Sequence, residues 1–213
     1  FSFFYLANIA PSFSKPPCFK DIKISSYTNC VGEDISNGMY YRGEFLSGKA
    51  HGIGELRISN SRWHRGEFSN DLYNGLGAEY SGNQNSILIG EWKKGKLIIG
   101  LAHSKYGFYY GKWKNKKFHG EGIFINSNNE IQIGFWEDGK FKSDYLSKES
   151  KKNCKKLKKK NNCFLLLKSD DGEVSLAFIK NKLINGLGYW RTKNNIHKFG
   201  YFKNNQNIGN GGI

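Results

Sequence analysis

The chain has 213 residues, of which 33 are Lys or Arg and 18 are Asp or Glu, so its formal net charge is +15 at pH 7. No stretch of 18 or more apolar residues occurs, and a transmembrane helix is therefore not expected. The charge is uneven: residues 148–160 hold eight lysines and one glutamate, which is +7 of the total and leaves +8 for the rest. Nucleic acid is a disfavoured partner, because no motif in the chain is of a kind that reads bases.

The first 14 residues are rich in apolar and aromatic side chains, above all from Phe1 to Ala10. Their length suits the apolar core of a secretory signal peptide, and Ser12 and Ser14 are small residues that would permit cleavage after Ser14. We interpret 1–14 as the end of a signal peptide in an N-terminally incomplete sequence, and we expect an exported protein, periplasmic or secreted. The alternatives are a hydrophobic strand that caps the fold, and a cytoplasmic or membrane-associated location.

Four cysteines fall in two close pairs, Cys18 with Cys30 and Cys154 with Cys163. Sequence alone allows three connectivities, and local pairing is the simplest because each pair brackets a short loop. Disulfides would persist in an exported compartment, and the first would tie a lead-in segment, 15–39, to the residues that follow. Four reduced thiols are the alternative. A zinc site is disfavoured because neither pair has Cys-x-x-Cys spacing, so no metal site is predicted.

A glycine pattern recurs every 21 to 24 residues from residue 40 to residue 213. The leading glycines are Gly43, Gly66, Gly90, Gly111 and Gly134, at steps of 23, 24, 21 and 23. Ala177 and Gly200 continue the series after a longer step of 43 residues. A second glycine pair stands 9 and 11 residues after most leading positions. The repeat glycines are Gly43, Gly52, Gly54, Gly66, Gly75, Gly77, Gly90, Gly111, Gly120, Gly122, Gly134, Gly186, Gly188 and Gly200. Such a period predicts an array, here of about seven repeats.

Two repeats depart from this spacing. The third has Ile99 and Leu101 in place of the second glycine pair, with Gly100 between them, and the fifth has Ser143 and Tyr145. These departures make the regularity of the two repeats uncertain, but they leave the predicted fold class unchanged.

Each repeat predicts two short strands joined by a tight turn. The first strand alternates, as in Tyr41, Gly43 and Phe45 against Arg42 and Glu44, which is typical of a half-buried strand. A turn follows at Ser47-Gly48-Lys49, Lys94-Gly95-Lys96 or Asp138-Gly139-Lys140, where glycine supplies the positive φ of a hairpin loop. The second strand begins at the Gly-x-Gly pair.

An aromatic residue stands two positions after most leading glycines. The missing side chains of the Gly-x-Gly pair would let this ring lie against bare backbone of the adjacent strand. Together with one tyrosine, these rings form the predicted binding face: Tyr41, Phe45, Phe68, Trp92, Trp113, Trp136 and Phe202.

The fifth repeat is interrupted by a lysine-rich insertion at about 146–162, after which a strand resumes at Phe164. A block of like charge is usually a solvated loop. The functional alternative is an anion-docking loop, because each lysine close to an anionic bilayer contributes about 1 kcal/mol. Its candidate residues are Lys151, Lys152, Lys155, Lys156, Lys158, Lys159 and Lys160.

These recurring residues resemble MORN repeats, whose pattern is Tyr-x-Gly-x-Trp, a Gly-Lys turn, and Gly-x-Gly followed by an aromatic residue. The resemblance covers about 40–213 and implies an all-β protein, an elongated single-layer antiparallel sheet of successive β-hairpins. The Pro16-Pro17-Cys18 segment followed by Asn29-Cys30 resembles the start of exported bacterial MORN-repeat proteins.

No catalytic or cofactor-binding constellation is predicted. None of the Gly-x-Gly pairs continues to the Gly-Lys-Ser/Thr of a phosphate loop, and His51 and His119 occupy one repeat position, which indicates packing. We therefore expect a non-enzymatic scaffold that contacts a protein partner or a second copy of itself as a homodimer. The alternatives are peripheral binding to anionic phospholipid membranes, a property linked with the resembled family, and an accessory role to a catalytic domain outside this sequence.

Overall fold

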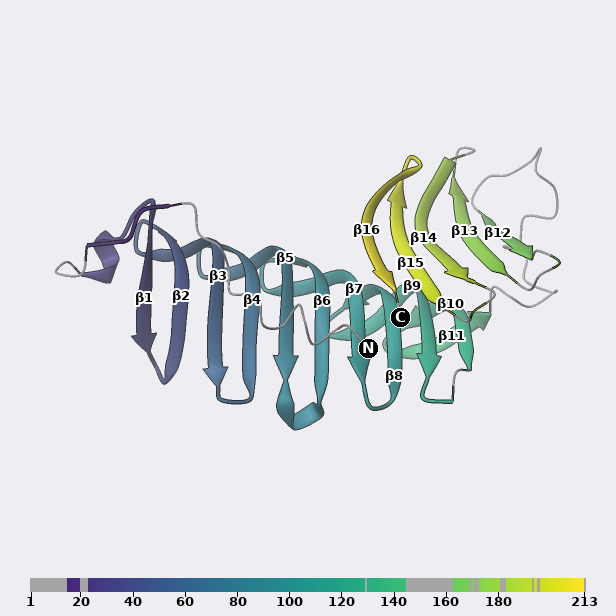
Figure 1. The fold of residues 1–213 in the computed structure, drawn as a ribbon, viewed down its shortest axis with the longest axis horizontal. Coiled ribbons are helices and arrows are strands. Elements are labelled where there is room, and N and C mark those ends of the chain that lie inside the picture. The colour runs from purple at the N-terminus through teal and green to yellow at the C-terminus, as the bar shows by residue number, and fades with distance from the viewer. Residues whose placement is uncertain are drawn as a thin grey trace. The chain divides into compact units, whose positions relative to one another are not determined.

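The computed structural model describes residues 15–19, 23–128, 130–144, 163–168, 170, 173–180, 183–192, 194 and 196–212. Those residues form two antiparallel sheets, one with strands β1 to β11 and one with strands β12 to β16, each in sequence order (Figure 1). The chain divides into two compact units, residues 1–106 and 107–213, which are described separately below.

Unit 1 begins with a short 3₁₀ helix, η1 (Ile24–Ser26), and a second one, η2 (Gly82–Gln84), joins β5 to β6. Each strand of this unit pairs antiparallel with the next one, and the strands lie side by side in chain order (Figure 1). The strands of unit 1 are β1 (Cys30–Ser36), β2 (Met39–Leu46), β3 (Lys49–Ser59), β4 (Arg62–Ser69), β5 (Leu72–Ser81), β6 (Ser86–Lys93) and β7 (Lys96–Ser104).

Unit 2 contributes strands to both sheets. The strands on the first sheet are β8 (Gly107–Lys114), β9 (Lys117–Asn126), β10 (Ile131–Glu137) and β11 (Lys140–Asp144). The strands of the second sheet are β12 (Cys163–Lys168), β13 (Val174–Lys180), β14 (Leu183–Arg191), β15 (His197–Lys203) and β16 (Gln206–Gly212). The strand predicted to resume at Phe164 is therefore present as β12, while residues 145–162, including the predicted lysine loop, lie outside the described residues.

Two-residue turns join the two strands of the first five repeats and of the seventh, while the turn of the sixth repeat lies outside the described residues. Both central residues have positive φ in each case, for example 52° and 74° at Ser47-Gly48 and 50° and 66° at Asn70-Asp71. Positive φ at both positions defines the type I′ turn, whose twist matches that of the flanking strands. The turns predicted at Gly48, Gly95 and Gly139 are confirmed, and asparagine, aspartate or lysine takes the same conformation where the repeat has no glycine.

One cross-strand row of glycines runs through the whole of unit 1. Neighbours in the row pair directly across the sheet, from β1 to β7, and its members are Gly32, Gly43, Gly54, Gly66, Gly77, Gly90 and Gly100. In the irregular third repeat Gly90 pairs with Gly100, where in the second repeat Gly66 pairs with Gly77. The third repeat thus keeps the cross-strand pair of glycines. The bulge between its two strands is one residue shorter than in the second repeat.

The lead-in segment contains half of a further repeat. Gly32 pairs with Gly43 as Gly54 pairs with Gly66, and Cys30 stands opposite Phe45 as Gly52 stands opposite Phe68. Strand β1 is therefore the second strand of a repeat in which cysteine replaces the first glycine. Where the first strand would lie, only Pro17 bridges to Val31, in parallel orientation.

The predicted all-β class of successive hairpins is confirmed, with the difference that β12 to β16 form a sheet of their own. Within the described ranges no helix is long and apolar enough to cross a membrane.

Candidate functional site

The core of each repeat is a cluster of rings on one face of the sheet. In unit 1 the rings of Tyr41 and Phe45 meet edge to face with centroids 5.2 Å apart, and Tyr41 meets Phe68 of the next repeat at 5.1 Å. His64 continues the series, stacked on Tyr73 at 3.5 Å and edge to face with Trp92 at 5.0 Å. These contacts join consecutive repeats, so the packing of the rings stabilises each repeat against its neighbours.

The ring that covers the second glycine of the Gly-x-Gly pair comes from two residues before the leading glycine. A Cβ at Gly54 would lie 2.6 Å from the Tyr41 ring, and a Cβ at Gly122 would lie 2.6 Å from the Tyr109 ring. The prediction that the ring two residues after the leading glycine lies against the pair is confirmed beside it: Phe68, Trp92 and Trp136 stand opposite the first glycine of the adjacent strand. The Trp92 and Trp136 indole N–H groups also donate to the carbonyl oxygens of Gly77 and Gly122. In the second sheet a Cβ at Gly188 would meet the Phe202 ring at 2.8 Å.

The first glycine of the pair is required for a different reason. Its φ is +71° at Gly52, +113° at Gly75 and +69° at Gly120, a region that residues with a side chain rarely adopt. Each lies at a bulge where the two strands of a repeat change register.

The predicted binding face is not available for binding. Phe45 is 2% exposed, Phe68 3% and Trp136 5%, and Tyr41 and Trp92 are each 6% exposed. These five rings face the core, because the positions of the leading glycine and its aromatic neighbours share one face of the sheet. The predicted face is therefore wrong for them; Trp113 and Phe202 are half-buried.

The opposite face of unit 1 carries a row of half-exposed or exposed side chains that the sequence analysis missed. We call it the outer row, and its members are Tyr40, Arg57, Trp63, Tyr80 and Ile87. The pairs Tyr40–Arg57, Arg57–Trp63, Trp63–Tyr80 and Tyr80–Ile87 stand directly opposite each other on neighbouring strands. The alternation of each strand marks these positions, since each lies three residues from the glycine of the cross-strand row on its own strand.

Ring and guanidinium contacts hold the outer row in place. The Trp63 and Tyr80 rings stack with centroids 5.8 Å apart, and the Arg65 guanidinium lies 4.7 Å above the Trp63 ring. Arg57 lies 6.0 Å from the Tyr40 ring. Such cation–π pairs fix the long arginine side chains without burying their charge.

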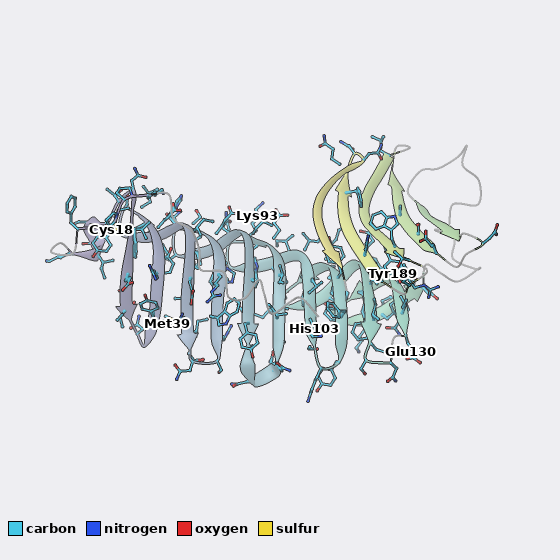
Figure 2. All side chains as sticks on the ribbon, in the orientation of Figure 1. Cys18, Met39, Lys93, His103, Glu130 and Tyr189 are labelled. Atoms are coloured by element: carbon cyan, nitrogen blue, oxygen red, sulfur yellow. A yellow bond between two sulfur atoms is a disulfide. The ribbon has the colours of Figure 1, made fainter. Side chains whose placement is uncertain are left out.

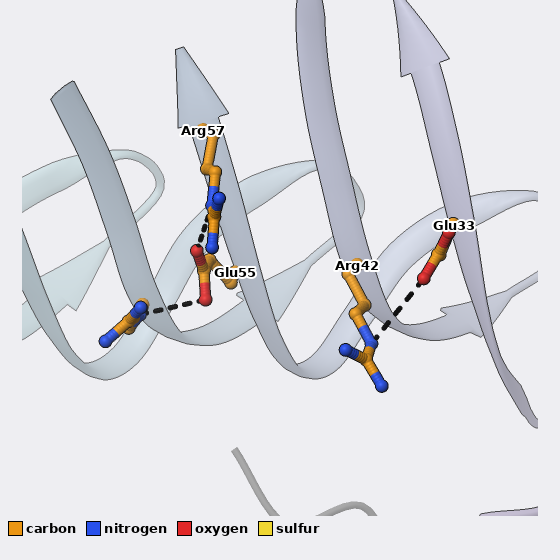
Figure 3. A network of polar contacts seen from close by, with 5 residues as sticks. Glu33, Arg42, Glu55 and Arg57 are labelled. Carbon is orange, nitrogen blue, oxygen red and sulfur yellow. Dashed lines mark hydrogen bonds and ion pairs between the residues drawn. The ribbon is translucent and has the colours of Figure 1, made fainter. Parts of the chain in front are cut away.

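A line of alternating charges runs beside the outer row (Figure 3). Glu55 accepts hydrogen bonds from Arg57 at 2.5 Å and from Arg65 at 2.9 Å, and Arg42 lies 3.7 Å from Glu33. Burial would raise the pKa of the Glu55 carboxyl, but the hydrogen bonds and charges of the two arginines hold that pKa below its usual value. The carboxylate therefore stays ionised and positions both guanidinium groups.

A different surface lies along the turns that join the two strands of each repeat. Exposed lysines flank these turns: Lys49, Lys93, Lys94 and Lys96 in unit 1, and Lys114, Lys116, Lys117 and Lys140 in unit 2. Figure 2 labels Lys93, which ends β6. Leu46 and Leu72 beside the turns of unit 1 are 41% and 46% exposed. Basic and apolar groups thus stand together at the turns.

Groups of three or more His, Cys, Asp or Glu suited to a metal ion do not occur in the described ranges. His64 is fully buried among rings, and its two ring nitrogens have no hydrogen-bond partner there. Burial lowers the pKa of His64 to about 3, so the imidazole is neutral at pH 7.

One of the two predicted disulfides is present. Cys18, labelled in Figure 2, is bonded to Cys30, and the lead-in segment is thereby tied to β1 as predicted. Cys154 lies outside the described residues, so its pairing with Cys163 stays a prediction.

Comparison with known proteins supports the repeat interpretation. The family model of the MORN repeat matches residues 41–61, 64–86 and 109–130. These stretches correspond to the first, second and fourth repeats of the glycine pattern. A search of curated proteins gave no match.

Proposed function

Because this chain contains MORN repeats, motifs known from binding and scaffold proteins, we propose that it is a non-enzymatic scaffold whose outer row binds a protein partner or a second copy of the chain. The observation that carries the proposal is the outer row itself. Its aromatic rings are half-exposed and its arginine is exposed, on the face opposite the core.

The composition of the outer row suits protein contact. Tyr, Trp and Arg are enriched at the centres of protein interfaces, because each combines a large apolar area with a polar group. Stacking and the Glu55 carboxylate hold the side chains of Trp63, Tyr80 and Arg57 in place before binding, which reduces the entropy lost on association. A row across adjacent strands would suit an extended segment or a second sheet.

Photo-cross-linking tests this proposal. A benzophenone amino acid replaces Trp63 in the full chain, and the matched control carries it at Tyr106, a 69% exposed ring in a turn away from the outer row. We expect a cross-linked product with position 63, whose mass tells a second copy from another protein. Equal yields at positions 63 and 106 would count against the proposal.

A second candidate function is peripheral binding to anionic phospholipid, supported by the exposed lysines and leucines at the turns. Each lysine near an anionic surface would contribute about 1 kcal/mol within a Debye length. Liposome co-sedimentation with the triple variant Lys93→Ala, Lys94→Ala and Lys96→Ala tests it. The matched control, Lys23→Ala, Lys105→Ala and Lys198→Ala, removes the same charge at exposed positions outside the Lys94-Gly95 turn. Equal loss of binding in both variants would show only a net-charge effect.

We also propose that the protein works in an oxidising compartment outside the cytoplasm. The Cys18–Cys30 disulfide supports this, since such bonds persist mainly in oxidising surroundings. The fate of residues 1–14 tests it: N-terminal sequencing of the protein made in its source cells should start after Ser14.

A further inference from the structure

A short segment, Lys15–Phe19, lies along the outer edge of β1, and we call it the strap. The Val31 amide donates to the Pro16 carbonyl, and the Cys18 amide donates to the Val31 carbonyl, both at 2.7 Å. These two bonds satisfy the outward backbone groups of Val31. The outward groups of Glu33 and Ile35, two and four residues further on, form no backbone hydrogen bond with any described residue.

The strap presents no new edge of its own. Pro17 is the residue whose backbone faces away from β1, since its neighbours on both sides bond to Val31. Proline has no amide hydrogen to donate, and it therefore blocks the addition of a further strand. Proteins commonly protect a sheet edge from pairing with another chain in this way.

Two further contacts hold the strap down. The Cys18–Cys30 disulfide anchors one end to β1, and the Lys15 ammonium lies 2.7 Å from the buried Glu44 carboxylate on β2. Cys18 and Cys30 also belong to the buried cluster that contains Tyr27 and Phe45. The strap is thus a fixed element, although among the described residues its backbone pairs with one residue of β1 alone.

We propose that the strap is an autoinhibitory cover on a strand-pairing edge, locked by the disulfide, and that uncovered β1 binds β1 of a second copy. In an antiparallel two-fold pair centred on Glu33, Val31 of each copy stands opposite Ile35 of the other. Ile35 is 79% exposed, so its pairing with Val31 would bury apolar surface on both sides. Arg42, 3.7 Å from Glu33, offsets the repulsion between the two central glutamates.

Release of the lock requires a reductant. A dithiol such as dithiothreitol transfers two electrons and two protons to the sulfurs of Cys18 and Cys30. The S–S bond breaks, two thiols form, and the reagent leaves as a cyclic disulfide. The strap then keeps its two backbone bonds, the Lys15–Glu44 ion pair and the packing of Cys18, and loses its covalent anchor.

Sedimentation equilibrium of the full chain tests this inference, which deepens the protein-contact role proposed above but uses different residues. We expect the double variant Cys18→Ser/Cys30→Ser, and the wild-type chain in dithiothreitol, to dimerise at least tenfold more tightly than the oxidised wild type. Adding Ile35→Glu to the double variant should abolish the gain, because it places further carboxylates at the pairing edge. The matched control, Leu76→Glu, changes a 64% exposed residue of β5 and should keep it.

The outcomes separate the two proposals. A folded double variant and a folded reduced chain that are no more dimeric than the oxidised chain would overturn the inference, as would a dimer that Leu76→Glu removes and Ile35→Glu does not. If both proteins lose their native tryptophan fluorescence, the disulfide serves folding and the autoinhibitory role is wrong. Cross-linking at Trp63 of the oxidised chain is independent of all these results, so failure of one proposal leaves the other open to its own test.

Discussion

His64 occupies the place that tyrosine holds in the first and fourth repeats. The Tyr41 and Tyr109 hydroxyl groups donate to the carbonyl oxygens of Glu44 and Lys112, both at 3.0 Å. An imidazole in the same place lacks a hydroxyl, and its nitrogens have no hydrogen-bond partner among the described residues. An unpartnered polar group inside a packed cluster destabilises the fold, and it does so more when it becomes charged.

The stability of unit 1 should therefore fall at mildly acidic pH. Because the folded pKa of His64 is about 3, against about 6.5 when unfolded, the unfolded state binds more protons between these values. Stability is fully present above pH 6.5 and falls below it, by about 1.4 kcal/mol per pH unit at most. Urea unfolding at pH 7 and pH 5 measures this loss. The stability of the variant His64→Tyr should depend less on pH than that of the wild type. An equal loss of stability in the variant and the wild type would contradict the assignment to His64.

A glycine under a tyrosine ring should tolerate no side chain. Gly122→Ala would place a methyl group 2.6 Å from the Tyr109 ring, and we expect a loss of about 3 kcal/mol in the free energy of unfolding. The control, Gly38→Ala, meets no atom within 4 Å but has φ of +73°, so it should cost only about 1 kcal/mol. Thermal unfolding compares the two, and similar losses would mean that the ring moves aside.

At the scale of elements, the hairpin turns link each repeat to the one before it. The second turn residue donates its amide to a carbonyl just after the preceding turn: Asp71 to Ala50, Gly95 to Tyr73 and Gly139 to Phe118. In the first repeat Gly48 donates to Tyr27, which directly follows η1. In the second repeat the Asp71 carboxylate also accepts from the Ala50 amide at 2.8 Å. The turns thus add hydrogen bonds between repeats to the ring contacts of the core.

The two roles of Asp71 can be separated by substitution. Asp71→Gly keeps the positive φ of 66° accessible and removes only the side-chain hydrogen bond, so it should cost about 1 kcal/mol. Asp71→Val also forces a β-branched residue into that conformation, and should cost about 1–2 kcal/mol more. Chemical denaturation measures both. Equal costs would mean that the backbone conformation does not matter here.

Much of this local structure could be predicted from sequence, and the reasons are local. Turns at Gly48, Gly95 and Gly139 follow from the positive φ that glycine adopts, and the leading glycines follow from a fixed period. Burial could not be predicted, because alternation shows that two faces differ without showing which one is covered. Phe45 and Trp92 were therefore assigned to a binding face when they form the core. Strand β1 was missed because Cys30 stands where the repeat has glycine.

At the scale of the whole molecule, each repeat depends mainly on its neighbours, so a local change should have a local effect. Reduction of Cys18–Cys30, which closes a sequence separation of 12 residues, should destabilise the start of unit 1 by about 3 kcal/mol. Hydrogen exchange followed by mass spectrometry, at a concentration where the reduced chain is a monomer, should show faster exchange in peptides from β1 and β2 and no change in peptides from β8 to β10. Uniformly faster exchange would indicate one cooperative fold.

The four backbone hydrogen bonds between turns point in one direction, since each of these donors reaches back to an acceptor that is earlier in the chain. During synthesis the acceptor has left the ribosome before its donor emerges. Each new hairpin can therefore pair with the preceding hairpin as soon as it emerges. The array can fold from its amino end toward its carboxyl end during synthesis.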